Sequence, residues 1–234
     1  MITLLGTGHV FRIEEPVSFI VKHTWPDAVL VELDVSRYEA LSSQVQPEGK
    51  GSPWAYRKMA KYQRNLAEEY GSQVGAELIA AVETGKIIGA DIGFIDTDAS
   101  QTMGSLWKEM SFAEKMRFRF SMIGDMFRRK SNAENVLREF ADDEDEYFAA
   151  MRKRYPTLVR KLIDERNVHM SERIKEAAER YNNIIVVIGD GHVEGIASLL
   201  EGQSIRKIRL KTLMDKESMD RLRAELWSGE REKE

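Results

Sequence analysis

The segment 184–188 contains only isoleucine and valine, and Gly189 follows it directly. Beta-branched residues favour strands, and a run without polar alternation is typical of a parallel sheet that helices cover on both faces. Residues 2–5 and residues 28–34 begin with the same kind of apolar run. We therefore expect these three segments to be strands of one buried, mostly parallel sheet.

Segments with helical periodicity alternate with the strands. This alternation predicts an α/β fold, with a central, mostly parallel sheet flanked by helices. Two more strand signals lie at 87–95 and 205–210, and Asp34 or Ser36 can cap the helix after the second strand. The other expected helices cover residues 14–23, 54–70, 73–84 and 193–201.

The block from about 100 to 182 has no convincing strand signal. It predicts a mainly helical insertion, or cap, between the third and fourth core strands. A chain of 234 residues is short enough for one α/β domain. We therefore expect a single domain, 1–234, with a charged C-terminal helix at 211–234.

Composition excludes several classes of site and partner. The chain has no cysteine, which excludes disulfides, thiolate metal sites and a cysteine nucleophile. The formal net charge of −4 argues against a nucleic-acid partner. No apolar run approaches the ~18 residues of a membrane span, and the N-terminus does not resemble a signal peptide. We expect a cytoplasmic protein without a transmembrane segment.

One short pattern occurs twice, as Gly-Thr-Gly-His at 6–9 and as Gly-Asp-Gly-His at 189–192. Each copy follows a predicted strand and ends in a histidine, His9 or His192. Ligands of open α/β sheets bind at the carboxyl ends of strands, so the two histidines can meet there. Glu32 lies near the end of the second strand, where a buried carboxylate is costly unless it is paired or binds a cation.

His9, His192 and Glu32 are a familiar ligand set for a divalent metal that keeps one position open for water. Nitrogen and oxygen ligands suit Mn, Co or Zn better than soft copper. Two imidazoles and a carboxylate can also serve as acid, base and anchor without a metal. Each histidine taken alone can instead be a core or capping residue bonded to the backbone.

The sequence resembles the TraB/PrgY family of pheromone-shutdown proteins, which is related to the TIKI proteases. The resemblance implies an α/β fold shared with erythromycin-esterase-like proteins, and a site built from both Gly-x-x-His motifs and the strand glutamate. The TIKI branch implies a metal-dependent protease that uses manganese or cobalt. The similar blocks lie at residues 6–10, 26–34, 37–41, 75–78, 95–98, 164–167 and 188–196.

The family motifs also contain Glu77, Asp96, Asp98 and Arg166. The resemblance suggests Glu77 or an aspartate as general base, and Arg166 as a donor that stabilises negative charge in the transition state. The simpler alternatives are an exposed helical glutamate, two helix caps and a surface ion pair. The catalytic candidates are Glu32, Glu77 and Arg166, and the substrate-binding candidates are Arg37, Asp96, Asp98, Gly8 and Gly191.

Three departures from the family pattern stand out. Phe11 replaces a serine that many members have, which removes a polar contact. Thr97 replaces an arginine, which removes a fixed positive charge beside Asp96 and Asp98. The charged tail stands where many members continue into membrane spans, so we expect a free-standing domain.

Three hypotheses for function follow. The first is a metal-dependent hydrolase that acts on peptide bonds, and the absence of His-Glu-x-x-His excludes the helix-based zinc protease geometry. The second is a non-catalytic protein of the pheromone-shutdown type, which binds a peptide or small signal molecule in the same cleft. The third is a regulatory module that forms a homo-oligomer through its charged helices.

Overall fold

The computed structural model describes residues 1–8, 11–43, 73–118 and 144–231. His9 and the helix expected at 54–70 lie outside these residues. Among the described residues no helix is long and apolar enough to cross a membrane.

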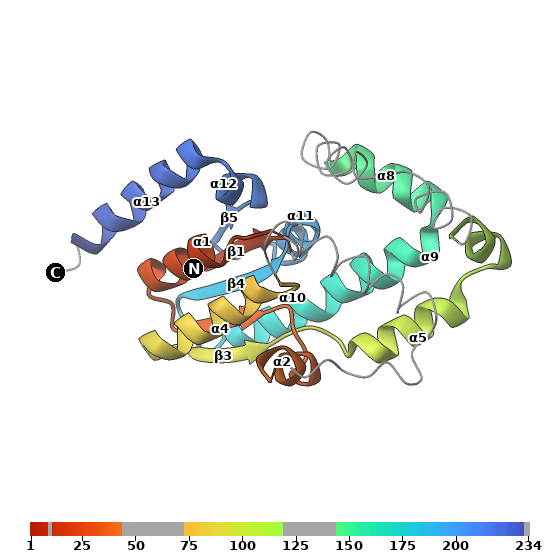
Figure 1. Cartoon of the computed structure of the whole chain (residues 1–234), viewed down its shortest axis with the longest axis horizontal. Helices are drawn as coiled ribbons and strands as arrows, with labels where there is room; N and C mark the ends of the chain where they lie inside the picture. Colours follow the sequence, from red (N-terminus) through yellow and green to blue (C-terminus); the bar gives the residue numbers. More distant parts are fainter. Residues whose placement is uncertain (9–10, 44–72, 119–143, 232–234) are drawn as a thin grey trace. The chain divides into compact units, whose positions relative to one another are not determined.

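Five parallel strands form one sheet in the order β3-β2-β4-β1-β5 (Figure 1). The prediction of an α/β fold with a parallel central sheet is confirmed. Strands β1 and β4 are central, and almost every residue of both is buried, as expected for strands covered on both faces. The strands are β1 (Ile2–Thr7), β2 (Ala28–Val31), β3 (Asp91–Phe94), β4 (Ile184–Gly189) and β5 (Ile205–Ile208).

Helices cover both faces of the sheet. On one face, Ile2 and Leu4 of β1 share a buried cluster with Met170 and Ile196, which belong to α10 (Glu165–Ala178) and α11 (Val193–Leu199). On the other face, α4 (Ala76–Ile88) packs against Val29 of β2. Helix α1 (Glu14–Thr24) packs on α4, and α13 (Lys216–Arg231) packs on α1 (Figure 1).

Strands β1 and β4 lie side by side, but the chain leaves them in opposite directions. From β1 it passes through α1 to β2, towards one edge of the sheet. From β4 it passes through α11 on the other face to β5, at the opposite edge. The carboxyl ends of β1 and β4 therefore flank a topological switch point, where open α/β sheets bind ligands.

The short helices follow directly from strand ends. Helix α2 (Val35–Ser42) begins after Asp34, whose side chain accepts a hydrogen bond from the backbone N–H of Arg37 at 2.9 Å. Of the two caps that the sequence allows, Asp34 rather than Ser36 is thus the N-cap. A 3₁₀ turn, η2 (Asp190–His192), follows β4, and α12 (Leu210–Met214) follows β5.

Two predicted strands are shorter than expected. The third begins at Asp91 rather than at 87, because Ile87 and Ile88 still belong to α4. Gly89 then ends this helix in the left-handed conformation, φ 79°, which glycine adopts without strain. The last strand ends at Ile208 rather than at 210, because Leu210 begins α12.

The chain divides into two compact units, residues 1–99 with 167–234, and residues 100–166. The second unit falls inside the stretch of the predicted insertion, whereas most of α10 belongs with the sheet. The named elements of the second unit are α5 (Ala99–Glu109), α8 (Glu144–Arg154), α9 (Pro156–Val159) and the π-helical turn η1 (Arg160–Asp164).

Within the second unit, the carboxylate of Glu114 accepts hydrogen bonds at the N-termini of two helices, the one that follows Ser111 and α9. Its Oε2 accepts hydrogen bonds from the N–H and Oγ of Ser111, both at 3.1 Å, and from Thr157 Oγ1 at 2.9 Å. Its Oε1 accepts one from the N–H of Thr157 at 2.9 Å. Ser111 Oγ accepts from the N–H of Glu114 in return, so the two residues form a capping box.

Replacing Glu114 with glutamine is expected to destabilise the second unit at neutral pH by about 1–2 kcal/mol. Burial opposes the charged carboxylate, but the four hydrogen bonds outweigh it and lower the pKa of Glu114. This contribution is present above the ordinary pKa of 4.5 and is lost as pH falls through the lower folded-state pKa. In denaturant melts, the difference between the two proteins should be smaller at about pH 3 than at pH 7; an equal difference at both would contradict this.

Candidate functional site

The carboxyl ends of β1, β2 and β4 lie together, because β4 pairs with both other strands. Thr7 of β1 is in register with Gly189 of β4, and Val31 of β2 with Val187. Thr7 Oγ1 also donates to the carbonyl oxygen of Ile188 at 3.2 Å. The two Gly-x-x-His motifs therefore begin at neighbouring positions of the sheet, next to the residue that follows β2.

That residue is Glu32, and its carboxylate is fixed by β4. The backbone N–H of Glu32 donates to the carbonyl oxygen of Val187 at 3.0 Å, which continues the pairing of the two strands. Its Oε2 accepts a hydrogen bond of 2.5 Å from the N–H of Gly189. Only 3% of Glu32 is exposed. The carboxylate is thus held at the switch point rather than in solvent.

His192 is the partner of this carboxylate. It ends η2, is 4% exposed, and places Nε2 3.5 Å from Glu32 Oε1. Its other ring nitrogen, Nδ1, lies 2.6 Å from Asn167 Oδ1, and since a carbonyl oxygen only accepts, Nδ1 is the donor. In the neutral ring the lone pair is therefore on Nε2, the nitrogen that faces Glu32.

A lone pair and a carboxylate oxygen that face each other need positive charge to hold them together. A proton on Nε2 meets this need, and so does a divalent cation bound by both atoms. Two ligands of a tetrahedral zinc ion, each 2.0–2.2 Å from the metal, lie about 3.4 Å apart, close to the observed 3.5 Å. The pair fits either an acid–base couple or two ligands of one metal ion.

The structure describes only part of the expected ligand set. Among the described residues no three His, Asp or Glu side chains form a group that could hold a metal ion. His9, the third expected ligand, lies outside the described residues, one position after Gly8 and two after the end of β1. Of the three expected ligands, the structure therefore shows the contact between two, Glu32 and His192.

Asn167 sets the orientation of the imidazole, and the fold leaves room for it at Gly195. A metal-binding histidine usually donates its second ring N–H to a fixed acceptor, which selects the tautomer. Asn167 is 6% exposed in α10, and Gly195 belongs to α11. A Cβ atom at Gly195 would lie 2.2 Å from Asn167 Nδ2, so the amide occupies the space that a side chain would fill.

Replacing Gly195 with alanine is therefore expected to displace Asn167 and release His192 Nδ1. The variant should lose about 1–2 kcal/mol of stability, and the ¹⁵N chemical shifts of His192 should show a change of tautomer. Gly104 in α5 is a matched control, because its added Cβ would meet no heavy atom within 4 Å. Gly104→Ala should gain up to about 1 kcal/mol through helix propensity. Equal stability of the two variants with unchanged His192 shifts would refute the account.

Asp190, in the second motif, ties β4 to the turn after β5. Arg209 donates to it through Nε and Nη2, both at 2.9 Å, and the N–H of Leu210 donates at 2.8 Å. This bidentate geometry is the strong form of an arginine–carboxylate pair. Arg209 also bonds Glu194, whose pKa is lowered chiefly by the hydrogen bond from Lys207. Asp190 thus braces the chain beside His192.

Arg37 and Asp96 join the ends of β2 and β3. Arg37 Nη1 lies 2.9 Å from Asp96 Oδ2, and Asp96 Oδ1 accepts from the N–H of Thr97 at 2.8 Å. Two percent of the Asp96 side chain is exposed against 33% of Arg37, so the pair is partly shielded from water. Asp98 is half-buried between β3 and α5.

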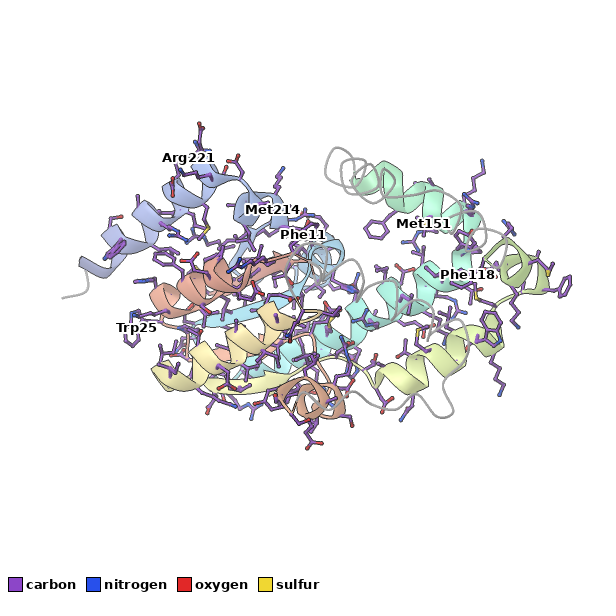
Figure 2. The ribbon with its side chains drawn as sticks, viewed as in Figure 1. Phe11, Trp25, Phe118, Met151, Met214 and Arg221 are labelled. Atoms are coloured by element: carbon purple, nitrogen blue, oxygen red, sulfur yellow. The ribbon has the colours of Figure 1, made fainter. Side chains whose placement is uncertain are left out.

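The remaining candidates are spread over the fold. Glu77 is fully buried in the first turn of α4, so the alternative of an exposed helical glutamate is wrong. An added Cβ at Gly8 would lie 2.8 Å from the ring of Phe11, which is buried at 5% exposure. Figure 2 labels Phe11. Gly191 is half-buried in η2. Arg166 belongs to the unit of residues 100–166, where its Nη1 donates to the carbonyl oxygen of Leu162 at 3.0 Å.

Asn167 is the site residue that the sequence reasoning did not select, although it lies in one of the similar blocks. Its helical spacing from buried apolar residues could have identified it from the sequence. Met170, Ile174 and Ala177 form an apolar stripe at helical spacing, and Asn167 continues that stripe with an amide. A polar residue in a buried stripe needs a partner in the core, and here the partner is His192.

Fold and site define an α/β protein with a buried imidazole–carboxylate pair at a switch point between parallel strands. Residues 1–211 match the model of the TraB/PrgY/gumN family, which is most of the chain, and the protein belongs to this family. An uncharacterized protein of Methanocaldococcus jannaschii is 29% identical over 212 residues. The match covers 86% of this chain and 53% of that relative, so the chain spans about half the relative's length.

Proposed function

We propose that this protein is a metal-dependent hydrolase, most similar in chemistry to a peptidase, with its site at the ends of β1, β2 and β4. The observation that carries the proposal is the separation of 3.5 Å between His192 Nε2 and Glu32 Oε1, both buried, with Nδ1 committed to Asn167. The resemblance to the TraB/PrgY family, which is related to the TIKI proteases, supports the same chemistry.

In this proposal His9, Glu32 and His192 hold one divalent ion of Mn, Co or Zn. The ion, when bound, would polarise a substrate carbonyl and lower the pKa of a water molecule. Asn167 keeps His192 Nε2 directed at the site, and the N–H of Gly189 fixes Glu32 through Oε2. Oε1, the oxygen that faces His192, is the proposed ligand atom.

The other candidates have supporting roles. Glu77, a fully buried carboxylate in the first turn of α4, is the proposed general base, as its place in a block similar to the family suggests. Arg166 is the proposed donor to the developing negative charge. Arg37 is paired with Asp96, and this ion pair holds the ends of β2 and β3 together. The proposed substrate contact of Arg37 is a further hydrogen bond from its guanidinium group to a substrate carboxylate. Asp98, Gly8 and Gly191 are the remaining proposed substrate contacts.

Hydrolysis of a fluorogenic peptide mixture tests this function. Chelator-stripped protein should be inactive, and Mn, Co or Zn should restore turnover to the wild type but not to His192→Ala. Full turnover in chelator would reject the metal-dependent reaction. Saturable peptide binding without cleavage at any metal would favour the second candidate, a peptide- or signal-binding protein of the pheromone-shutdown type.

A further inference from the structure

Strand β5 is an edge of the sheet, and among the described residues it pairs with β1 alone. The N–H of Ile2 donates to the carbonyl oxygen of Ser204 at 2.9 Å. In a parallel ladder every second residue bonds the same neighbour, so Arg206 and Ile208 continue the bonds to β1. Ile205 and Lys207 then direct their N–H and C=O groups away from β1, as a template for another strand.

A hollow of about 230 Å³ adjoins this edge. Three consecutive strand residues, 206–208, line it. Side chains of neighbouring strand residues point to opposite faces, so a hollow that all three line runs along the strand's edge. The opposite wall is one stripe of α13 with helical spacing, and Thr212 of α12 also lines it; the stripe consists of Ser218, Arg221, Leu222 and Glu225.

The lining of this β5–α13 groove is apolar at depth and positive at the rim. Ile208 and Leu222 are buried, at 4% and 7% exposure. The lining contains three cations, Arg206, Lys207 and Arg221, and one carboxylate, Glu225, which pairs with Arg206 at 3.0 Å. Lys207 also pairs with Glu194 of α11 at 2.8 Å, and Arg221 lies 3.8 Å from Glu217. The side chain of Arg221 is 71% exposed on α13 (Figure 2). The groove therefore suits an extended segment that carries acidic side chains.

We propose that the β5–α13 groove binds an extended, acidic segment of a partner protein, which joins the sheet as a sixth strand beside β5. The backbone of Ile205 and Lys207 supplies the strand-to-strand hydrogen bonds, and the cationic rim selects acidic side chains. This docking site does not depend on the chemistry at the strand ends.

Charge distinguishes this partner from a second copy of the chain. In antiparallel pairing of two copies, the outward-facing residues 205 and 207 of one β5 strand must lie opposite outward-facing residues of the other. A two-fold axis at residue 206 then places Arg206 opposite Arg206, and one at residue 207 places Lys207 opposite Lys207. Like charges directly opposite each other destabilise a strand pair. The edge is thus unfavourable for self-association and favourable for an acidic strand.

The test uses two fluorescent peptides with blocked ends, one that alternates glutamate with valine and one that alternates lysine with valine. Fluorescence anisotropy should show binding of the acidic peptide only, and the affinity should fall as salt rises. Lys207→Pro removes an outward N–H but none of the bonds to β1, and it should weaken binding at least about tenfold. Lys207→Gln keeps that N–H and should weaken binding less.

A second variant keeps the test informative if the proline variant unfolds. Arg221→Glu changes only an exposed side chain of α13, and it should weaken the acidic peptide and strengthen the basic one. Equal binding of both peptides, or wild-type binding by Lys207→Pro that melts normally, would overturn the proposal. A dimer in light scattering that Lys207→Pro abolishes would also overturn it, because a second copy would then occupy the edge.

Discussion

Replacing Gly6 with alanine is expected to lower the free energy of unfolding by about 3–5 kcal/mol. An added Cβ would lie 2.0 Å from Asp190 Oδ1 and 3.1 Å from Val193. Asp190 cannot move aside without breaking its bonds to Arg209 and to the N–H of Leu210. Because that carboxylate joins β4 to the turn after β5, the loss reaches the centre of the sheet.

Thermal melts of a double-mutant cycle measure this effect. Gly6→Ala alone should lower the melting temperature by roughly 10 °C. In the Asp190→Ala background the same glycine change should cost far less, since the clashing side chain is gone. Additive losses in the double variant would show that Asp190 is not what excludes a side chain at Gly6.

Glu32→Gln is expected to reduce metal affinity and metal-dependent turnover by more than about 100-fold while the fold is kept, since even a second-shell change costs about 10–100-fold. The amide oxygen of glutamine can still accept the N–H of Gly189. Its NH₂ group would then face His192 Nε2 and donate to the lone pair, which replaces the cation by a neutral hydrogen bond. The substitution removes a ligand and a charge without leaving an unsatisfied buried group.

Circular dichroism and metal-dependent peptide hydrolysis together check this expectation. Asn167→Ala is the matched comparison, because it removes the group that orients His192 but no proposed ligand, and it should lose about 10–100-fold. If Glu32→Gln retained wild-type turnover and metal dependence, Glu32 would not be a ligand.

Local sequence signals were sufficient for the parallel sheet and for the contact between Glu32 and His192. The apolar runs at 28–31 and 184–188 specify buried strands, and a parallel sheet brings their carboxyl ends to one side. A glutamate directly after one run and a Gly-x-x-His motif after another then meet. The contact between Glu32 and His192 follows from these features, because β2 and β4 are neighbours in the sheet.

The rest depends on packing between segments distant in the sequence. Asn167 reaches His192 only because α10 packs on the same face as α11, and because residue 195 has no side chain. The partner of Asp190 is Arg209, from beyond β5, and no motif marks it. The third strand was expected too early, because Ile87 and Ile88 have strand propensity, but Gly89 ends the helix after them.

Isothermal titration of the chelator-stripped protein with Mn, Co and Zn tests the central claim most directly, on wild type and on Glu32→Gln. We expect one ion per chain for the wild type and none for the variant. At 100 times the dissociation constant, the ion should add about 2.7 kcal/mol to wild-type stability, which a melt can verify. Wild-type protein that binds none of the three ions, or a variant that binds them equally well, would contradict a metal site at the ends of these strands.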